Sequence, residues 1–214
     1  MNPMHKRRNA AMLAIIVLAV AALAIAAFGG NQGRRADTGM PAGNGVDAAF
    51  AEEMVAHHQS AVEMAMIARS RATTQFVKTL ADDVIAAQTS EITKMRAIRA
   101  DLPKPAGNRG TDMRDMGMAV SPSMLRSARP FDRAFVDMMV PHHQGAIRMA
   151  RIERDKGTNP GLRRIADAVV SAQAREIKAM NDFRTKQYGA PSPAGGVPSA
   201  EDSSSGLFES HGGG

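Results

Sequence analysis

Apolar residues recur at helical spacing in four stretches of this chain. In the first stretch, Phe50, Met54 and Ala61 fall near one line at about 100° per residue, with polar residues on the opposite side. Residues typical of helix starts precede the stretches, namely Asp47, Thr74, Asp132 and Asn159-Pro160. The pattern predicts no sheet, and helices over about residues 48–71, 75–100, 132–156 and 160–186.

The four predicted helices form a tandem repeat. Residues 50–95 align with residues 135–180 at an offset of 85, without a gap and with 20 identities in 46 positions. Each copy is a helical hairpin whose apolar stripe it cannot bury alone, so we expect the two hairpins to pack face to face. The predicted fold is an all-α four-helix bundle with approximate two-fold symmetry. It covers residues 47–187, with repeats 47–100 and 132–187 joined by a Met-, Gly- and Pro-rich connection over 101–131.

The two ends of the chain have other characters. A basic head, His5 to Arg8, precedes an uncharged apolar run over residues 10–28, which predicts an N-terminal hydrophobic helix. Residues 1–30 are interpreted as a signal peptide or a signal anchor, so the rest of the chain is expected outside the cytoplasm. It would be secreted, or held at the cell membrane by one N-terminal helix. Residues 31–46 are predicted to be a flexible tether, and 188–214 a disordered tail.

The charge and the amino-acid composition exclude several partners and kinds of metal site. The net charge is +6, but three of the basic residues lie in the head, and no long basic run follows, so nucleic acid is not predicted as a partner. The chain has no cysteine, which excludes disulfides and thiolate metal sites. It has 16 methionines, so any soft ligand must be a thioether.

Four of the six histidines lie in the two copies of one motif, Met54 to Gln59 and Met139 to Gln144. In each copy the histidines straddle the buried stripe, and the symmetry brings both pairs toward one interior. The second helix of each hairpin adds polar residues to its own apolar stripe, where an unpaired polar group costs several kcal/mol. The residues concerned are His57, His58, His142 and His143 on the first helices, with Gln88, Glu91, Gln173 and Glu176 on the second.

This constellation has two interpretations. In the first it is a metal site with the four histidines as ligands, the two glutamates as ligands or as acceptors of an imidazole N–H, and the glutamines supporting them. In the second it is a buried hydrogen-bond network that binds nothing. Imidazole with thioether and no thiolate suits copper, especially Cu(I), whereas carboxylate-rich sites suit iron or manganese. The repeated methionines near the histidines are either thioether ligands or core filling; they are Met54, Met64, Met95, Met139, Met149 and Met180. Within the connection, Met113, Met116 and Met118 are an auxiliary Cu(I) site or a loop that packs on the bundle.

The run from Phe131 to Ala146, followed by Met149-Ala150 and later by Gln173 to Met180, resembles the family named domain of unknown function 305. The resemblance implies a ferritin-like bundle, an exported bacterial protein and an association with copper handling. It also adds Gln59 and Gln144 to the motif as residues that support the ligands. Ala56 stands in the first copy where the second has the family's proline, Pro141, which predicts two unequal half-sites.

Three functions remain open from the sequence. The first is a metal-binding bundle that binds, buffers or chaperones copper. The second is a metal-dependent redox enzyme acting on peroxide or Cu(I), and the third is a structural or partner-binding bundle without metal. No glutamate stands three residues before any of the four histidines, so a di-iron ferroxidase is disfavoured, and no catalytic residue is assigned. The expected partners are a metal ion and, if residues 10–28 are not cleaved, the membrane.

Overall fold

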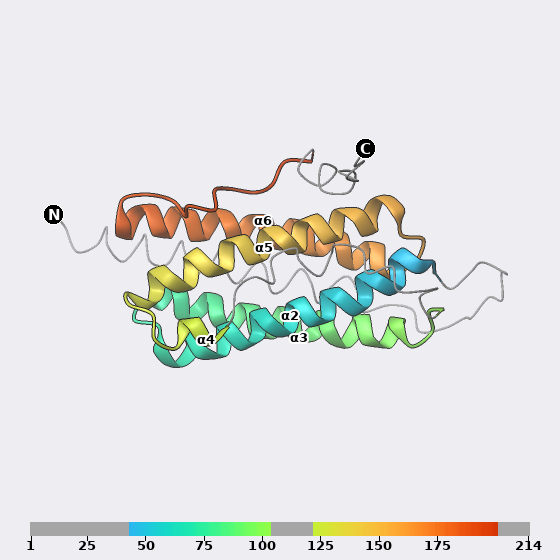
Figure 1. Cartoon of the computed structure of the whole chain (residues 1–214), viewed down its shortest axis with the longest axis horizontal. Coiled ribbons are helices and arrows are strands. Elements are labelled where there is room, and N and C mark those ends of the chain that lie inside the picture. The colour runs from blue at the N-terminus through green and yellow to red at the C-terminus, as the bar shows by residue number, and fades with distance from the viewer. Residues whose placement is uncertain (1–42, 104–121, 201–214) are drawn as a thin grey trace, which may run out of the picture.

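The computed structural model describes residues 43–103 and 122–200 (Figure 1). The predicted N-terminal helix and the three methionines of the connection lie outside these residues. The described helices are α2 (Gly45–Arg71), α3 (Gln75–Arg99), α4 (Pro122–Leu125), α5 (Phe131–Lys156) and α6 (Pro160–Tyr188). Within 43–103 and 122–200, none of them is both long and apolar enough to cross a bilayer.

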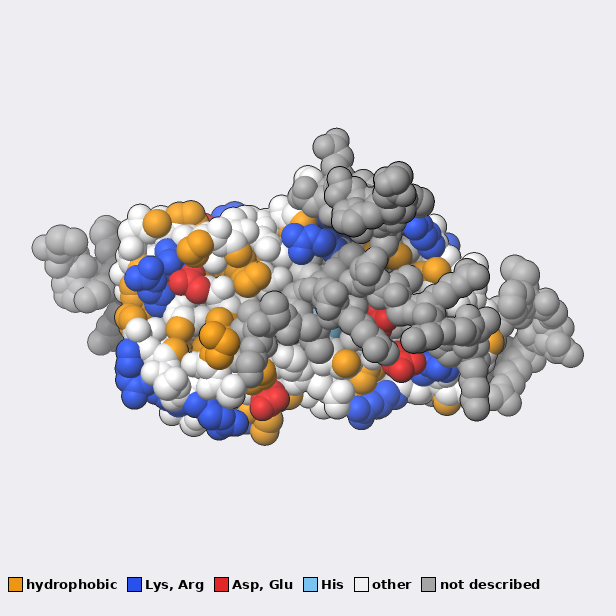
Figure 2. Space-filling view, in the orientation of Figure 1, with side chains coloured by type: hydrophobic (Ala, Val, Ile, Leu, Met, Phe, Trp, Pro, Cys, Tyr) orange, Lys and Arg blue, Asp and Glu red, His pale blue; other side chains and the backbone are white. Residues whose placement is uncertain are grey.

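The long helices pair as the repeat predicts. α2 packs along α3 and α5 along α6, and the two hairpins meet chiefly through α2 and α5, which run in opposite directions (Figure 1). The predicted all-α bundle of two hairpins is therefore confirmed. On the face that Figure 2 shows, Lys and Arg side chains lie in several separate groups among apolar and acidic ones.

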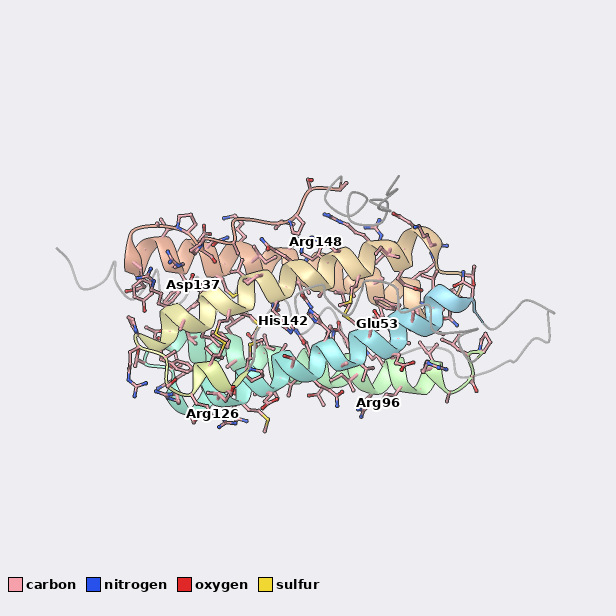
Figure 3. The ribbon with its side chains drawn as sticks, in the orientation of Figure 1. Glu53, Arg96, Arg126, Asp137, His142 and Arg148 are labelled. Atoms are coloured by element: carbon pink, nitrogen blue, oxygen red, sulfur yellow. The ribbon has the colours of Figure 1, made fainter. Side chains whose placement is uncertain are left out.

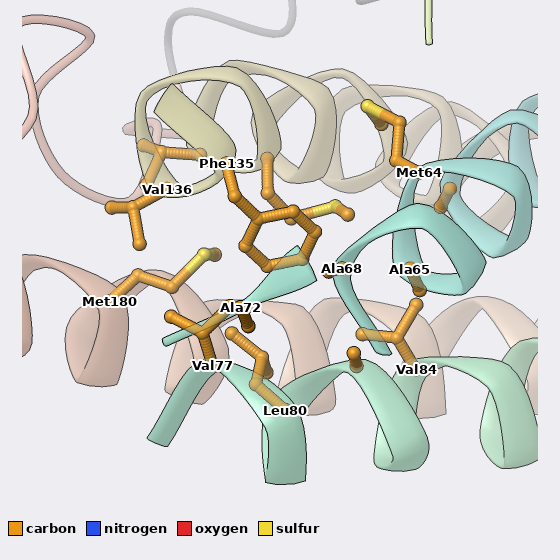
Figure 4. Packing of buried hydrophobic residues seen from close by; sticks show 14 of the residues in the cluster. Met64, Ala65, Ala68, Ala72, Val77, Leu80, Val84, Phe135, Val136 and Met180 are labelled. Atoms are coloured by element: carbon orange, nitrogen blue, oxygen red, sulfur yellow. The ribbon is translucent and has the colours of Figure 1, made fainter. Parts of the chain in front are cut away.

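Two apolar clusters fill the bundle, one toward each end. The first cluster contains Met64, Ala68, Leu80, Phe135 and Met180 among others, drawn from all four long helices (Figure 4). The second is formed around Phe50, Met54, Met149, Leu162 and Ile165. Along α2 the second cluster ends at Met54 and the first begins at Ala61, so the histidines lie between the two clusters. On α5 the order is reversed and the clusters overlap beyond the histidines, since Ile147 belongs to the first cluster and Ala146 to the second.

Helix α2 begins three residues before its predicted start. Asn44 is the N-cap, and its side chain accepts hydrogen bonds from the backbone N–H groups of Val46 and Asp47. Asp47, which the sequence predicts as the N-cap, is the third helical residue and accepts from the Asn44 N–H, which completes a capping box. The last residues of the predicted tether therefore belong to the helix and its cap.

The two equivalent aspartates, Asp47 and Asp132, connect the two repeats. Asp132, at the start of α5, accepts hydrogen bonds from the N–H groups of Thr73 and Thr74, at 2.9 and 2.8 Å, and from the Thr73 hydroxyl. Asp47 does the same for the other repeat, accepting from Thr158 and from the N–H of Asn159. Each aspartate therefore binds the hairpin turn of the opposite repeat. Burial alone would raise the pKa of Asp132, but the hydrogen bonds from Thr74 and Thr73 outweigh it and lower the pKa.

Glu153 breaks the symmetry at one end of the bundle. It is fully buried beside Asp47, and its equivalent in the first repeat is Ala68. Burial, the contact with Asp47 and the charge of Asp47 raise the pKa of Glu153 to about 9. Glu153 is therefore protonated at neutral pH, so that two buried ionised carboxylates do not lie side by side.

The first part of the predicted disordered tail is ordered. Residues 190–200, here called the strap, run back along α6 and α5 from the end of α6 (Figure 1). Gln144, Arg151, Asn181 and Arg184 donate side-chain hydrogen bonds to strap carbonyl oxygens. The Pro- and Gly-rich composition predicts disorder because such a segment has little apolar surface, whereas here the helices bind its backbone.

We expect Asp132→Ala to lower the free energy of unfolding by about 2–4 kcal/mol, because it leaves two turn N–H groups without their charged acceptor. Asp82→Ala, which removes an exposed pair with Arg69, should cost less than about 1 kcal/mol. Denaturant unfolding at pH 7 measures both. Equal costs would show that the contact between the repeats is not important for stability.

Candidate metal centre

The centre of the bundle is a layer of four histidines between the two apolar clusters. The ring of His57 on α2 lies against the ring of His142 on α5, with their centroids 3.7 Å apart. Figure 3 shows His142 in the middle of the bundle, between these two helices. His58 and His143 complete the layer, each 6.4 Å from the ring that precedes it in sequence. The fold therefore brings the histidines of both repeats into one interior.

His57 and His142 are held in the neutral form. Burial lowers the pKa of His57 well below its ordinary value of 6.5, and His142, His58 and His143 lower it further, with slight opposition from the His142 backbone. The pKa of His142 is lowered in the same way, first by burial and then by His143 and His58. None of the four ring nitrogens of this pair makes a hydrogen bond of ordinary geometry. Neutral imidazole is the form that binds metal.

His58 and His143 are each held by a glutamate. Nε2 of His58 lies 2.8 Å from Oε2 of Glu91, and Nε2 of His143 lies 2.6 Å from Oε2 of Glu176. An ionised carboxylate can only accept, so we assign the hydrogen to Nε2 in both rings. Their Nδ1 atoms are buried without a hydrogen-bond partner. A carboxylate that holds one ring nitrogen in this way is typical of histidines that bind metal through the other.

The glutamines of α3 and α6 do not complete a hydrogen-bond network with the histidines and glutamates. Gln88 and Gln173 are each 3% exposed, and their Oε1 atoms have no hydrogen-bond partner. A self-sufficient buried network would pair these oxygens with donors, because an unpaired buried polar atom costs roughly 1–3 kcal/mol. The observation weighs against the interpretation in which the layer binds nothing.

The other two predicted glutamines lie outside the layer. Gln59 is exposed on the outer face of α2. Gln144 is buried, but it donates to the strap carbonyls of Ala194 and Gly196, at 2.8 and 2.7 Å. The family resemblance implied a supporting role for both, but on a helix the residue after a histidine points about 100° away from it.

The six predicted methionines are all buried and are divided between the two clusters. Met64, Met139 and Met180 belong to the first cluster, and Met54, Met95 and Met149 to the second. Each cluster thus combines one repeat's Met64-type residue with the other repeat's Met54- and Met95-type residues. Met54 and Met139 lie one helical turn before His57 and His142, so they bring thioethers to both sides of the histidine layer.

The side chains of the layer are not close enough together to supply the three or four ligands that some metals need. Among residues 43–103 and 122–200, no three His, Asp or Glu side chains lie close enough together to hold an ion as they stand. Tetrahedral zinc requires such a set. Two facing imidazoles suit Cu(I) better, because this ion is stable with as few as two ligands.

One acidic residue near the layer was missed by the sequence analysis. Asp83 on α3 has its pKa raised to about 6 by burial first, and then by the charges of Glu176 and Asp82. The equivalent residue near the other glutamate is Ala168. The two halves of the layer therefore differ in charge, and the only sequence signal was an aspartate at a partly buried position of the repeat.

Comparison with known proteins gives one family and several solved structures. The family model described as domain of unknown function (DUF305) matches residues 47–184. No curated protein matches the chain. CopM in its Cu(I)-bound form is 31% identical, covering 67% of this chain and 98% of that one with a TM-score of 0.58. CopM has also been solved with Cu(II) and with silver.

Two further structures carry the same family name. A DUF305 protein from Streptomyces coelicolor that is thought to be secreted is 31% identical, covering 68% of this chain and 94% of that one with a TM-score of 0.62. A DUF305 fragment from Deinococcus radiodurans is 25% identical, covering 69% and 99% with a TM-score of 0.58.

The lowered pKa values of His57 and His142 predict how the metal-free protein responds to acid. Unfolding lets both rings bind protons near pH 6.5, while the folded state does not, so the free energy of unfolding should fall as the pH drops below about 6.5. In His142→Gln this dependence should be shallower. Denaturant unfolding between pH 7.5 and 5, with a chelator present, measures both slopes, and identical slopes would contradict the assignment.

Proposed function

We propose, from the premise that the chain belongs to the domain of unknown function 305 family, that it is an extracytoplasmic copper-binding protein. The observation that carries the proposal is the facing pair His57 and His142, whose buried ring nitrogens have no hydrogen-bond partner. A cation bound by these nitrogens would replace the interactions with water that folding removes. Neutral rings bind it without first releasing a proton.

Copper is favoured by the donors available. The layer offers imidazole, with thioethers on both sides, and the chain has no thiolate. Iron and manganese prefer carboxylates, but Glu91 and Glu176 are already engaged by His58 and His143. The binding of Cu(I), Cu(II) and silver by CopM supports the same class of metal, since silver shares the soft character of Cu(I).

The residues have distinct proposed roles. His57 and His142 are the two central ligands. His58 and His143, whose Nδ1 atoms have no hydrogen-bond partner, are further candidate ligands that would reach the ion only if the layer contracted around it. Glu91 and Glu176 fix the orientation and the tautomer of those two rings. Met54, Met64, Met95, Met139, Met149 and Met180 are the candidate thioether ligands on either side of the layer. An auxiliary Cu(I) site is proposed, from the sequence alone, at Met113, Met116 and Met118.

We assign binding, and with it buffering or delivery of copper, in preference to catalysis. The four histidines are 0–1% exposed, which suits the retention of an ion more than the turnover of a substrate such as peroxide. We propose that residues 1–30 act as a signal peptide or signal anchor and that the bundle lies outside the cytoplasm, and the Streptomyces relative that is thought to be secreted supports this location.

The deciding experiment offers copper, zinc and iron in competition to the purified metal-free chain. We expect copper to be retained, and His57→Ala to weaken Cu(I) binding by at least ~10-fold, or about 1.4 kcal/mol. His211→Ala, which changes a tail histidine, is the matched control and should have no effect. Retention of no metal at micromolar affinity would refute the proposal. If the copper-loaded protein turns over peroxide or oxidises Cu(I), the proposed function is wrong and the protein is a redox enzyme.

A double-mutant cycle tests whether the two repeats share one ion. His57→Ala and His142→Ala should show a coupling energy well above the ~0.5 kcal/mol expected for independent sites, because their rings are in contact. Isothermal titration with Cu(I) under a competing chelator supplies the four affinities. Additive effects would mean that each hairpin holds its own ion.

Methionine ligation is tested by Met54→Leu, with exposed Met66→Leu as the control. Met54→Leu nearly conserves volume, so it should change stability by less than about 1.5 kcal/mol while lowering the Cu(I) affinity. Met66→Leu should change neither quantity. If the Cu(I) affinity of Met54→Leu equals that of the unaltered chain, Met54 is core filling and not a ligand.

A further inference from the structure

A short sequence pattern follows each repeat and is not explained by metal binding. The strap contains Pro191-Ser192-Pro193-Ala194-Gly195, and the connection after α3 begins with Pro103-Lys104-Pro105-Ala106-Gly107. Both segments thus read Pro-x-Pro-Ala-Gly, at an offset of 88. The offset exceeds that of the repeats by three residues, in keeping with the longer α6.

The strap shows how the second repeat binds such a segment. Gln144 donates to the carbonyl oxygens of Ala194 and Gly196, and Arg151 donates to those of Pro198 and Ser199. Arg184, paired with Asp137, donates to Ala190 and Pro191. As a result, all six residues from 142 to 147 are buried, on every side of α5.

The outer face of α2 and the end of α3 carry the equivalents of some of these groups. Gln59 is the counterpart of Gln144, and the pair Glu52 and Arg99, 3.8 Å apart, is the counterpart of Asp137 and Arg184. Among the described residues nothing covers this face, so Ala56, Gln59 and Glu63 are exposed where their equivalents lie under or beside the strap. Met66 stands where the second repeat has Arg151, Arg96 stands where it has Asn181, and Arg99 is already paired with Glu52. Gln59 is therefore the donor that recurs on this face without a described acceptor.

The ends of the connection show that its path must lead from one end of α2 to the other. Leu102 packs in the second cluster with Ala48 and Phe50, at the start of α2. At the far end of α2, Arg71 donates to the carbonyl of Leu125 in α4. The helix between is about 40 Å long, and the 18 residues from 104 to 121 can extend to roughly 60 Å.

The face also fits the connection in shape and charge. Beyond Gln59 it continues into a groove of about 390 Å³ lined by Glu63, Met66 and Arg126 among others. The connection brings Lys104 and Arg109, and the face presents Glu52 and Glu63. In the register given by the offset of 88, Arg109 meets the opposite charge of Glu63, whereas Lys104 takes the place of Ser192 and lies nearer Arg96, the equivalent of Asn181.

We propose that the outer face of α2 is a docking surface for residues 103–110 of the same chain, bound as the strap is bound on α5. By the offset of 88, the carbonyl oxygens of Ala106 and Asn108 accept hydrogen bonds from the amide of Gln59. Arg109 takes the place of Val197 and faces Glu63, the equivalent of Arg148. The inference does not depend on copper.

Disulfide trapping tests this register directly, because the chain has no cysteine of its own. Glu63→Cys with Arg109→Cys is the test pair, and Arg148→Cys with Val197→Cys is its equivalent on the strap. Thr89→Cys, at an exposed position of α3, with Arg109→Cys measures chance collisions. The test pair should form an intramolecular disulfide at a rate near that of the strap pair and at least ~10-fold above the Thr89 pair, because docking raises the effective concentration.

A second readout leaves Glu63 and Arg109 unchanged. Gln59→Ala should speed tryptic cleavage after Arg109 severalfold, whereas Thr89→Ala should not. A test pair that reacts no faster than the Thr89 pair overturns the proposal, as does an equal cleavage rate in the two alanine variants. A disulfide that links two chains also overturns it, because the occupant would then be a second copy.

Discussion

The contact of α2 with α5 across the approximate two-fold axis is the constraint on which the rest of the structure depends. It places the ring of His57 against that of His142 in a layer between two apolar clusters. Burial there removes water from polar nitrogens and supplies no hydrogen-bond partner in return. Apolar packing on both sides of the layer compensates for the free-energy cost of burying these unpaired nitrogens. The nitrogens remain able to bind a ligand, which an apolar core could not do.

Packing of two flat helix faces would not by itself fix which residues meet on the axis. Asp47 and Asp132 supply that register, because each starts one hairpin and binds the turn of the other through backbone N–H groups. A slide of one hairpin along the other would break both sets of hydrogen bonds at once. The same two contacts therefore close the ends of the bundle and align the histidines at its centre.

The sequence predicted the features that depend on periodicity and repetition, and missed those that depend on which individual polar groups meet in the folded chain. The offset of 85 was enough for four helices, their pairing and a shared histidine interior. Asp47 was interpreted as a local cap because its long-range partners, Thr158 and Asn159, lie more than a hundred residues away. The strap was interpreted as disordered because the helix donors that bind its carbonyls cannot be read from its own composition. Glu153 gave no signal, since a buried protonated carboxyl looks in sequence like any surface glutamate.

The geometry of the layer also bears on how many ions it would hold. Two cations about 4 Å apart repel by roughly 4 kcal/mol at an effective dielectric constant of 20, and the rings of His57 and His142 are already in contact. A single ion shared on the axis avoids that repulsion and uses one nitrogen from each repeat. The surroundings of such an ion are unequal, since Asp83 lies near Glu176 while Ala168 is its equivalent near Glu91. The two repeated hairpins thus supply two matching histidine ligands. The positions at which the repeats differ in sequence make the surroundings of the ion unequal on its two sides.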